Sequence, residues 1–129
     1  MIPLTGQGKG SFRFRKEEHL KKKKDIGEVF SRGKRIGCQG AKLFILPNNL
    51  SCNRICFTFS RNYGNAVKRN RARRLGREAY RSLSPGLSKG YDLIFMVYPD
   101  TSEPEIKSCG LAERTEQLRY LFVKGGLLK

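Results

Sequence analysis

The sequence has no tryptophan, one histidine and few acidic side chains. Its eleven Asp and Glu residues are scattered and form no motif, and His19 lies in a lysine-rich stretch. A nuclease that works alone needs clustered carboxylates for two metals, or a histidine placed beside a lysine or a nucleophile. The sequence therefore predicts no catalytic residue and no metal site within this chain.

Long apolar runs are also missing. No run approaches the ~20 residues that span a bilayer, and no segment combines a strong apolar face with basic flanks. The first ten residues, MIPLTGQGKG, lack the apolar core of a secretory signal. We therefore expect a cytoplasmic protein.

Cysteine is sparse and its spacing is uninformative. Cys38, Cys52, Cys56 and Cys109 match no zinc pattern, and the one histidine is distant. A disulfide framework needs an oxidising compartment. We expect four reduced, partly buried thiols, with a structural metal as a remote alternative.

Positive charge is what the chain has in excess. Twenty-seven Lys and Arg against eleven Asp and Glu give a formal net charge of +16. Such a field favours a polyanionic partner such as nucleic acid. At 129 residues and 38% hydrophobic residues, the chain is long enough for one domain with a modest core. Residues 1–18 are rich in glycine and alternate basic and aromatic residues, so we expect a flexible basic arm followed by a single RNA-binding domain over residues 19–129.

The central stretch, residues 60–81, reads SRNYGNAVKRNRARRLGREAYR. We expect a turn through Gly64 and Asn65 that leads into a long helix. At about 100° per residue, one arc of this helix is suited to packing. Its members are Lys68, Ala72, Leu75, Gly76, Ala79 and Leu83. The remaining arc consists of Arg69, Asn70, Arg71, Arg73, Arg74, Arg77 and Arg81.

Arginine dominates the second arc. A guanidinium can bind a phosphate with two hydrogen bonds and can also stack on a base. A solvated basic helix without a partner is the alternative interpretation, because surface helices often carry charge runs. Only Glu78 can neutralise its neighbours here, so a polyanion would relieve the repulsion between them.

The flanking segments predict a helix and three or four strands. Ile26, Val29 and Phe30 have the spacing of a short amphipathic helix over residues 20–33. Strands are expected at residues 41–46, 54–60 and 91–98, with one more short strand near Ile36. Pro47 and the asparagines after it indicate a hairpin-like link between the first two of these strands.

The strands differ in pattern. Residues 54–60 alternate, with Ile55, Phe57 and Phe59 on a core face and small or polar residues on a face that could line a groove. Residues 91–98 are almost continuously apolar, as in a strand buried on both faces. A last helix from residue 105 carries an apolar stripe and a solvated face. The stripe comprises Ile106, Leu111, Leu118, Leu121 and Phe122, and the solvated face comprises Glu113, Arg114, Glu116 and Arg119.

The predicted fold class is α+β, a single sheet with helices packed on it. The order of elements is helix, strand, strand, with one further short strand, then helix, strand, helix. The general rule would make the strand–helix–strand crossover around the basic helix right-handed.

The central stretch resembles the signature of the protein subunit of bacterial ribonuclease P. In that family a Gly-x-Ala-Val turn leads into an Arg-Asn-Arg core and a basic helix that ends in Arg-Glu-aromatic-Arg. The matching residues are Gly64, Ala66, Val67, Arg69, Asn70, Arg71, Arg73, Arg74, Leu75, Arg77, Glu78, Tyr80 and Arg81. The resemblance covers residues 19–98 and, loosely, the last helix. It implies a left-handed crossover.

The resemblance also implies a function. In ribonuclease P an RNA with bound Mg²⁺ is the catalyst, and the protein assists removal of the 5′ leader from precursor tRNA. The expected partners are that catalytic RNA and precursor tRNA, with no membrane and no small-molecule substrate, and Mg²⁺ is held mainly by the RNA. The residues implied to bind the catalytic RNA are Lys68, Arg69, Asn70, Arg71, Arg73, Arg74 and Arg77. Those implied to bind the leader, in a cleft between the first helix and the sheet, are Ile26, Phe30, Phe44, Ser60 and Arg61.

Two positions depart from the family pattern. Ile26 stands where the family often has an aromatic residue, and Tyr98 and Pro99 stand where an Ala-Arg pair is frequent. A small basic ribosomal protein is the alternative function, because such proteins share this composition and kind of fold. A sequence-specific DNA binder would need a helix-turn-helix, and the sequence shows none.

Overall fold

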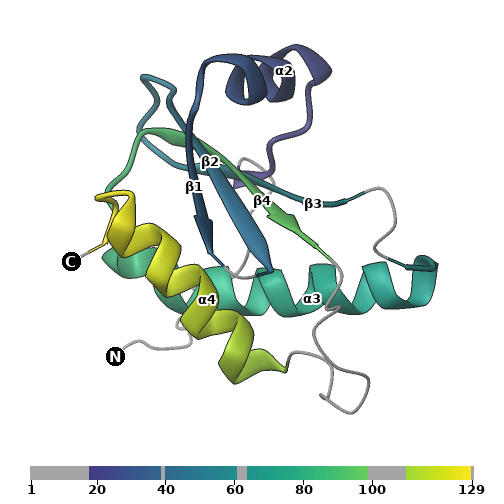
Figure 1. The fold of residues 1–129 in the computed structure, drawn as a ribbon. Coiled ribbons are helices and arrows are strands. Elements are labelled where there is room, and N and C mark those ends of the chain that lie inside the picture. Colours follow the sequence, from purple (N-terminus) through teal and green to yellow (C-terminus); the bar gives the residue numbers. More distant parts are fainter. Residues whose placement is uncertain (1–17, 39, 61–63, 99–109, 129) are drawn as a thin grey trace, which may run out of the picture.

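The computed structural model describes residues 18–38, 40–60, 64–98 and 110–128. Within these ranges it confirms the predicted α+β order (Figure 1). The elements are α2 (Lys23–Arg32), β1 (Lys34–Cys38), β2 (Ala41–Pro47), β3 (Arg54–Phe59), α3 (Ala66–Leu83), η2 (Ser84–Gly86), β4 (Tyr91–Val97) and α4 (Leu111–Lys124). The expected short strand is β1. Arg61, Ile106, Cys109 and all but the last residue of the predicted arm lie outside the described residues.

The four strands form one mixed sheet in the order β1-β2-β4-β3. β4 pairs antiparallel with β2 and parallel with β3, which confirms its predicted position in the middle of the sheet. The predicted hairpin-like link from β2 to β3 is wrong, because β4 lies between them. The hairpin is instead formed by β1 and β2. β4 is the most apolar strand, and a neighbour on each side lets it bury both faces.

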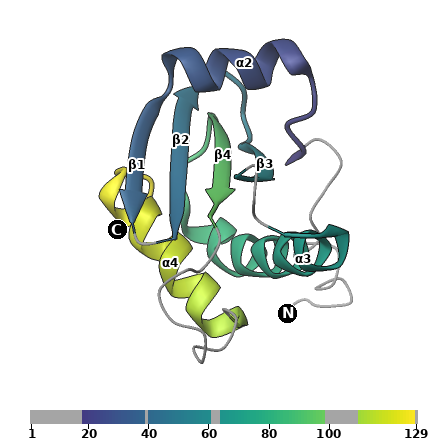
Figure 2. The same ribbon diagram turned by 45° about the vertical axis from the view of Figure 1, so that its right-hand side comes forward.

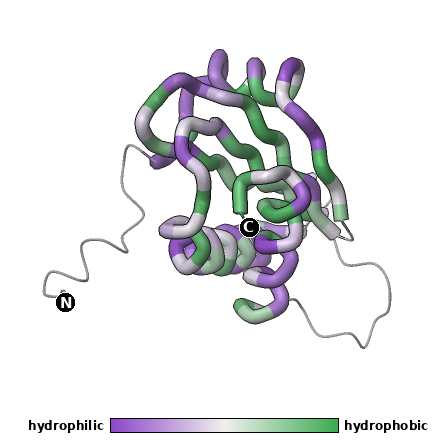
Figure 3. The backbone as a smooth tube through the Cα atoms, turned by 90° about the vertical axis from the view of Figure 1, so that its left-hand side faces the viewer, coloured by the Kyte–Doolittle hydropathy of each residue, from purple (hydrophilic) through white to green (hydrophobic). Residues whose placement is uncertain are grey.

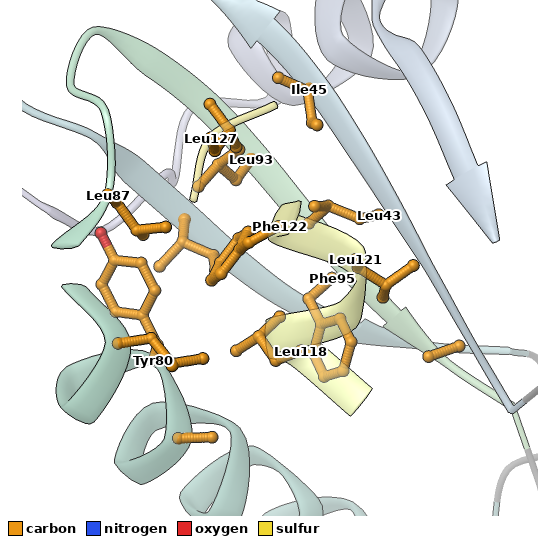
Figure 4. Close-up of a cluster of buried hydrophobic side chains, with 14 of the residues drawn as sticks. Leu43, Ile45, Tyr80, Leu87, Leu93, Phe95, Leu118, Leu121, Phe122 and Leu127 are labelled. Atoms are coloured by element: carbon orange, nitrogen blue, oxygen red, sulfur yellow. The ribbon is translucent and has the colours of Figure 1, made fainter. Parts of the chain in front are cut away.

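Helices α3 and α4 cover one face of the sheet. Their buried residues, including Tyr80, Leu118 and Phe122, form the main core with Leu43 and Phe95 from the strands (Figure 4). The Tyr80 and Phe122 rings meet edge to face with centroids 6.4 Å apart. In Figure 3 the strands are largely coloured as hydrophobic, while hydrophilic and hydrophobic residues alternate along the helices. This face therefore supplies most of the apolar burial that stabilises the fold.

Helix α2 lies on the other face and crosses the sheet near the C-terminal end of β2 (Figure 2). It packs through a small second cluster in which Leu20, Val29, Phe44 and Ile94 are buried. Val29 is the only buried residue of α2 itself. The attachment of α2 thus depends on few apolar contacts.

Helix α4 differs from the predicted last helix in two details. Leu118, Leu121 and Phe122 are buried as expected, but Leu111 is exposed because it occupies the first turn of the helix. Arg114, predicted on the solvated face, is buried, and its Nη1 donates to Gln117 Oε1 at 2.7 Å. Helical spacing places Arg114 beside Leu118 and Leu121, and the sheet covers that side of α4.

Candidate nucleic-acid interface

Gly64 and Asn65 lead into α3. Gly64 has a φ of +144°, a value that side-chain-bearing residues rarely adopt. Asn65 is the N-cap, and its Oδ1 accepts a hydrogen bond from the Lys68 N–H at 3.0 Å. The first turn of α3 extends beyond β3 (Figure 1), which leaves Lys68 exposed and not in the predicted packing arc.

The body of α3 separates a packed side from a basic side. Ala72, Gly76, Ala79 and Leu83 are buried, as predicted, together with Tyr80, which the sequence analysis did not assign to the packed arc. The absence of a side chain at Gly76 permits close contact, because a Cβ there would lie 2.8 Å from Cδ1 of Phe57. Four members of the predicted basic arc have exposed side chains. They are Asn70, Arg71, Arg74 and Arg77.

Two arginines of the basic arc lie against the edge of the sheet. The guanidinium carbons of Arg73 and Arg69 stand 5.2 Å and 6.0 Å from the centroid of the Phe59 ring, within cation–π range. Arg73 also donates from Nη1 to Asn70 Oδ1 at 3.0 Å. These contacts limit the rotamers of Arg69 and Arg73, so they are more ordered than the outward-facing arginines.

Cys56 lies on the face of the sheet opposite to α3. Cys56 belongs to the cluster beneath α2. Burial raises the pKa of its thiol above the usual value, while the Arg73 guanidinium opposes that shift.

On the sheet face that carries α2, burial decreases along the strands. Phe44 and Ile94 are buried beneath α2, whereas the next positions along the strands, Met96 and Thr58, are half-buried and Lys42 is exposed. Lys42 Nζ lies 5.6 Å from the centroid of the Tyr98 ring. We call this less buried part the open half-face. It consists of Lys42, Thr58, Ser60, Met96 and Tyr98.

The aromatic pair predicted to line a cleft has one exposed member. The rings of Phe30 and Phe44 meet edge to face with centroids 4.8 Å apart. Phe30 is 37% exposed, but Phe44 is only 6% exposed. Phe44 therefore offers little surface to a base, and its predicted role as a stacking platform is corrected to a core residue that supports Phe30.

Other predicted leader residues are at the margins of this surface. Ile26 is half-buried and packs on the small cluster beneath α2. Ser60 follows β3 and is half-buried, and its N–H donates to the Val97 carbonyl at 3.0 Å. Arg61 is outside the described residues. The structure thus brings Ile26 and Phe30 beside one end of the sheet face and Ser60 to the other.

A polar network that the sequence analysis missed joins α2 to the sheet. Arg54 on β3 makes two hydrogen bonds with Asp92 on β4, at 2.8 Å from Nε and 2.6 Å from Nη2. The hydrogen bond with Asp92 raises the pKa of Arg54. Arg54 Nη1 also lies 3.4 Å from Asp25 Oδ2 on α2. The signal available in the sequence was one acidic residue, Asp92, within an otherwise apolar strand.

Cys38, Cys52 and Cys56 are thiols, and burial raises the pKa of Cys38 as it does that of Cys56. In the described part of the chain, no three His, Cys, Asp or Glu side chains come together as a metal site would require. No helix in these ranges is long and apolar enough to cross a membrane.

The fold and these surfaces define a small, strongly basic α+β protein with an arginine-rich helix beside a partly exposed sheet face. A family model described as Ribonuclease P matches residues 14–123, and the chain belongs to this family. A ribonuclease P protein component from Pelotomaculum thermopropionicum is 44% identical over 84 residues, which cover 65% of this chain and 75% of the relative. One from Natranaerobius thermophilus is 38% identical over 90 residues, covering 70% and 78%.

Solved structures show the same fold at lower identity. The ribonuclease P protein from Thermotoga maritima aligns with a TM-score of 0.72 and 22% identity, over 83% of this chain and 96% of that one. The protein from Staphylococcus aureus gives a TM-score of 0.72 at 18% identity, over 87% and 98%. These similarities confirm the predicted fold class.

Proposed function

We propose that this protein is the protein component of a bacterial-type ribonuclease P, which binds the catalytic RNA and the 5′ leader of precursor tRNA. The holoenzyme removes the leader to give the mature 5′ end. The observation that carries the proposal is the basic side of α3 within a chain that belongs to the ribonuclease P family. Family membership supports this activity, and we assign the two RNAs to two surfaces of the protein, as follows.

The basic side of α3 is the surface for the catalytic RNA. Its exposed arginines present planar forks to phosphates, while Arg69 and Arg73 are ordered on Phe59. Glu78 is the one carboxylate of α3 that could compete with RNA phosphates for these arginines, and it pairs with Arg81 at 2.8 Å. The residues in this role are Lys68, Arg69, Asn70, Arg71, Arg73, Arg74 and Arg77.

The open half-face and the adjacent rim of α2 form the surface for the leader. Phe30 offers an exposed ring, and the Tyr98 ring with Lys42 above it offers a second aromatic and cationic contact. Bases of any sequence stack on such rings, and Lys42 can neutralise a phosphate. Ser60 follows Phe59, on whose ring Arg73 lies, so an RNA strand that runs from Phe30 along the open half-face to Ser60 would also reach the basic side of α3.

The chain contributes no catalytic group to this proposal. Mg²⁺ held mainly by the RNA would supply the metal chemistry of phosphodiester hydrolysis. The arginines reduce the repulsion between RNA phosphates that have to approach one another, which lowers the Mg²⁺ concentration needed for activity. The protein therefore assists the RNA by binding and positioning.

The direct test is cleavage of a precursor tRNA by the cognate catalytic RNA at low Mg²⁺, with and without the protein. The expected result is a large stimulation that falls as salt rises. Arg74→Ala should reduce it, and Arg119→Ala on the exposed side of α4 is the matched control for loss of one arginine. No stimulation, together with sedimentation of the protein with ribosomal subunits, would contradict the proposal and support a ribosomal role.

A further inference from the structure

Helix α2 is attached to the sheet by two kinds of contact. Apolar contacts are few, because Val29 is the single buried side chain of the helix. The polar contact is the ion pair between Asp25 and Arg54, whose side chains are 31% and 23% exposed. Half-buried Ile26 and the contact of Phe30 with Phe44 add to Val29, and the ion pair adds a polar constraint on the rotation of the helix about its axis.

The Arg54 end of this contact is rigid. Its guanidinium is held by Asp92, whose side chain is 6% exposed, with both carboxylate oxygens within 2.8 Å of guanidinium nitrogens. Asn48 Nδ2 donates to Asp92 Oδ1 at 2.8 Å and so links Asp92 to the loop after β2. A two-point guanidinium–carboxylate bond fixes the plane of the guanidinium. The remaining nitrogen, Nη1, is thereby aimed at Asp25.

Asp25 and Phe30 lie on opposite margins of the side of α2 that faces the sheet. They are five residues apart, which corresponds to about 140° around a helix. Val29 lies between them in angle and contacts the sheet. If α2 rotates about its axis and Asp25 moves away from Arg54, the Phe30 ring also changes its position relative to Phe44.

We propose that Asp25 and Arg54 are positioning residues for the precursor leader: their ion pair fixes the rotation of α2 so that the Phe30 ring packs on Phe44 and keeps its exposed part available to the leader. The inference rests on the proposed function, since the leader is the ligand concerned. Neither residue needs to touch RNA. Asp25 would be an unusual RNA contact, because a carboxylate repels phosphates.

The test variant is Asp25→Asn, and Glu28→Gln is its matched control. Both changes remove one negative charge from α2, but Glu28 pairs with Arg32 of the same helix at 2.9 Å, whereas Asp25 pairs with a residue of the sheet. Charge alone predicts slightly tighter RNA binding for both variants. Loss of positioning predicts weaker leader binding for Asp25→Asn only.

Affinity is measured for the holoenzyme with a series of precursors of increasing leader length. We expect Asp25→Asn to bind long-leader precursors about two- to fivefold more weakly than wild type, the range typical of a partly exposed ion pair. Binding of mature tRNA and of the catalytic RNA should not weaken. Arg54→Lys keeps the charge and loses the planar fork, so it should show the same leader-specific loss. Equal affinities for Asp25→Asn and Glu28→Gln across the series would overturn the inference.

Hydrogen exchange of the isolated protein separates this outcome from failure of the proposed function. In Asp25→Asn the amides of Val29 and Phe30 should exchange faster than in wild type or Glu28→Gln, while those of β4 remain protected. If wild type shows no leader dependence at all, the proposed function is wrong and the positioning role with it. Unchanged exchange in Asp25→Asn would contradict the inference whatever the RNA assay shows.

Discussion

The pair Phe30 and Phe44 allows a sharp separation of a core residue from a binding residue. Their ring centroids are 4.8 Å apart, but Phe30 is 37% exposed and Phe44 only 6%. Phe44→Ala removes a buried ring from the small cluster beneath α2, and such changes cost about 3–5 kcal/mol of unfolding free energy. With roughly 4 °C per kcal/mol for a domain of this length, the melting temperature should fall by about 12–20 °C.

Phe30→Ala should behave differently. Its cost in stability is the edge-to-face contact and a part-buried ring, about 0.5–1.5 kcal/mol. If Phe30 stacks on a leader base, its loss weakens binding of long-leader precursors by about 1–3 kcal/mol, or roughly 5- to 150-fold. Mature tRNA should bind as before.

The assay measures thermal unfolding of each variant beside the affinity of the reconstituted holoenzyme for precursors with and without a leader. Binding is measured well below the melting temperature of Phe44→Ala, so that the destabilised protein is still folded. The reasoning is refuted if Phe30→Ala binds long leaders as well as wild type does, or if Phe44→Ala leaves the melting temperature unchanged.

Three further predictions concern other parts of the molecule. Arg71→Ala should weaken assembly with the catalytic RNA by about 1–3 kcal/mol for every precursor alike and reduce the salt dependence by about one phosphate contact, whereas Arg119→Ala should do neither; equal effects of the two in a gel-shift titration would contradict the role of α3. Gly64→Val should cost about 1–3 kcal/mol of unfolding free energy, because a φ of +144° is strained for a residue with a side chain and the added Cβ would lie 3.0 Å from Cδ of Lys68. Denaturant unfolding identical to wild type would show that the turn adapts. Iodoacetamide at pH 8 should alkylate Cys38 and Cys56 more slowly than free cysteine, because burial raises both pKa values and lowers the thiolate fraction, and mass spectrometry that finds free-cysteine rates would contradict their burial.

The sequence was sufficient to predict the elements but not their pairing. The alternation of residues 54–60 and the apolar run of residues 91–98 follow from the two-residue period of a strand, and both are confirmed by β3 and β4. The neighbours of β2 depend on contacts between distant segments, so a turn signal at Pro47 wrongly suggested pairing with β3. The left-handed crossover stays a prediction from the family resemblance.

For similar reasons, the position of some residues of the candidate site could be predicted from the sequence and that of others could not. The two sides of α3 could be predicted because helical spacing is regular, although Lys68 is exposed where the helix extends past the sheet. The burial of Phe44 could not be predicted from the sequence, because it depends on where α2 lies on that face of the sheet. The ion pair of Asp25 with Arg54 joins residues 29 positions apart, and no local pattern indicates it.

The most direct test of the central claim is the preference of the enzyme for precursor over mature tRNA. The catalytic RNA alone and the reconstituted holoenzyme are titrated with the same tRNA, with and without its leader, at one salt and Mg²⁺ concentration. We expect the protein to increase affinity for the precursor severalfold and to leave that for mature tRNA nearly unchanged, because the leader binds to the protein at Phe30 and the open half-face. An equal gain for both ligands would show that the protein acts only through the catalytic RNA and would contradict a leader site on this chain.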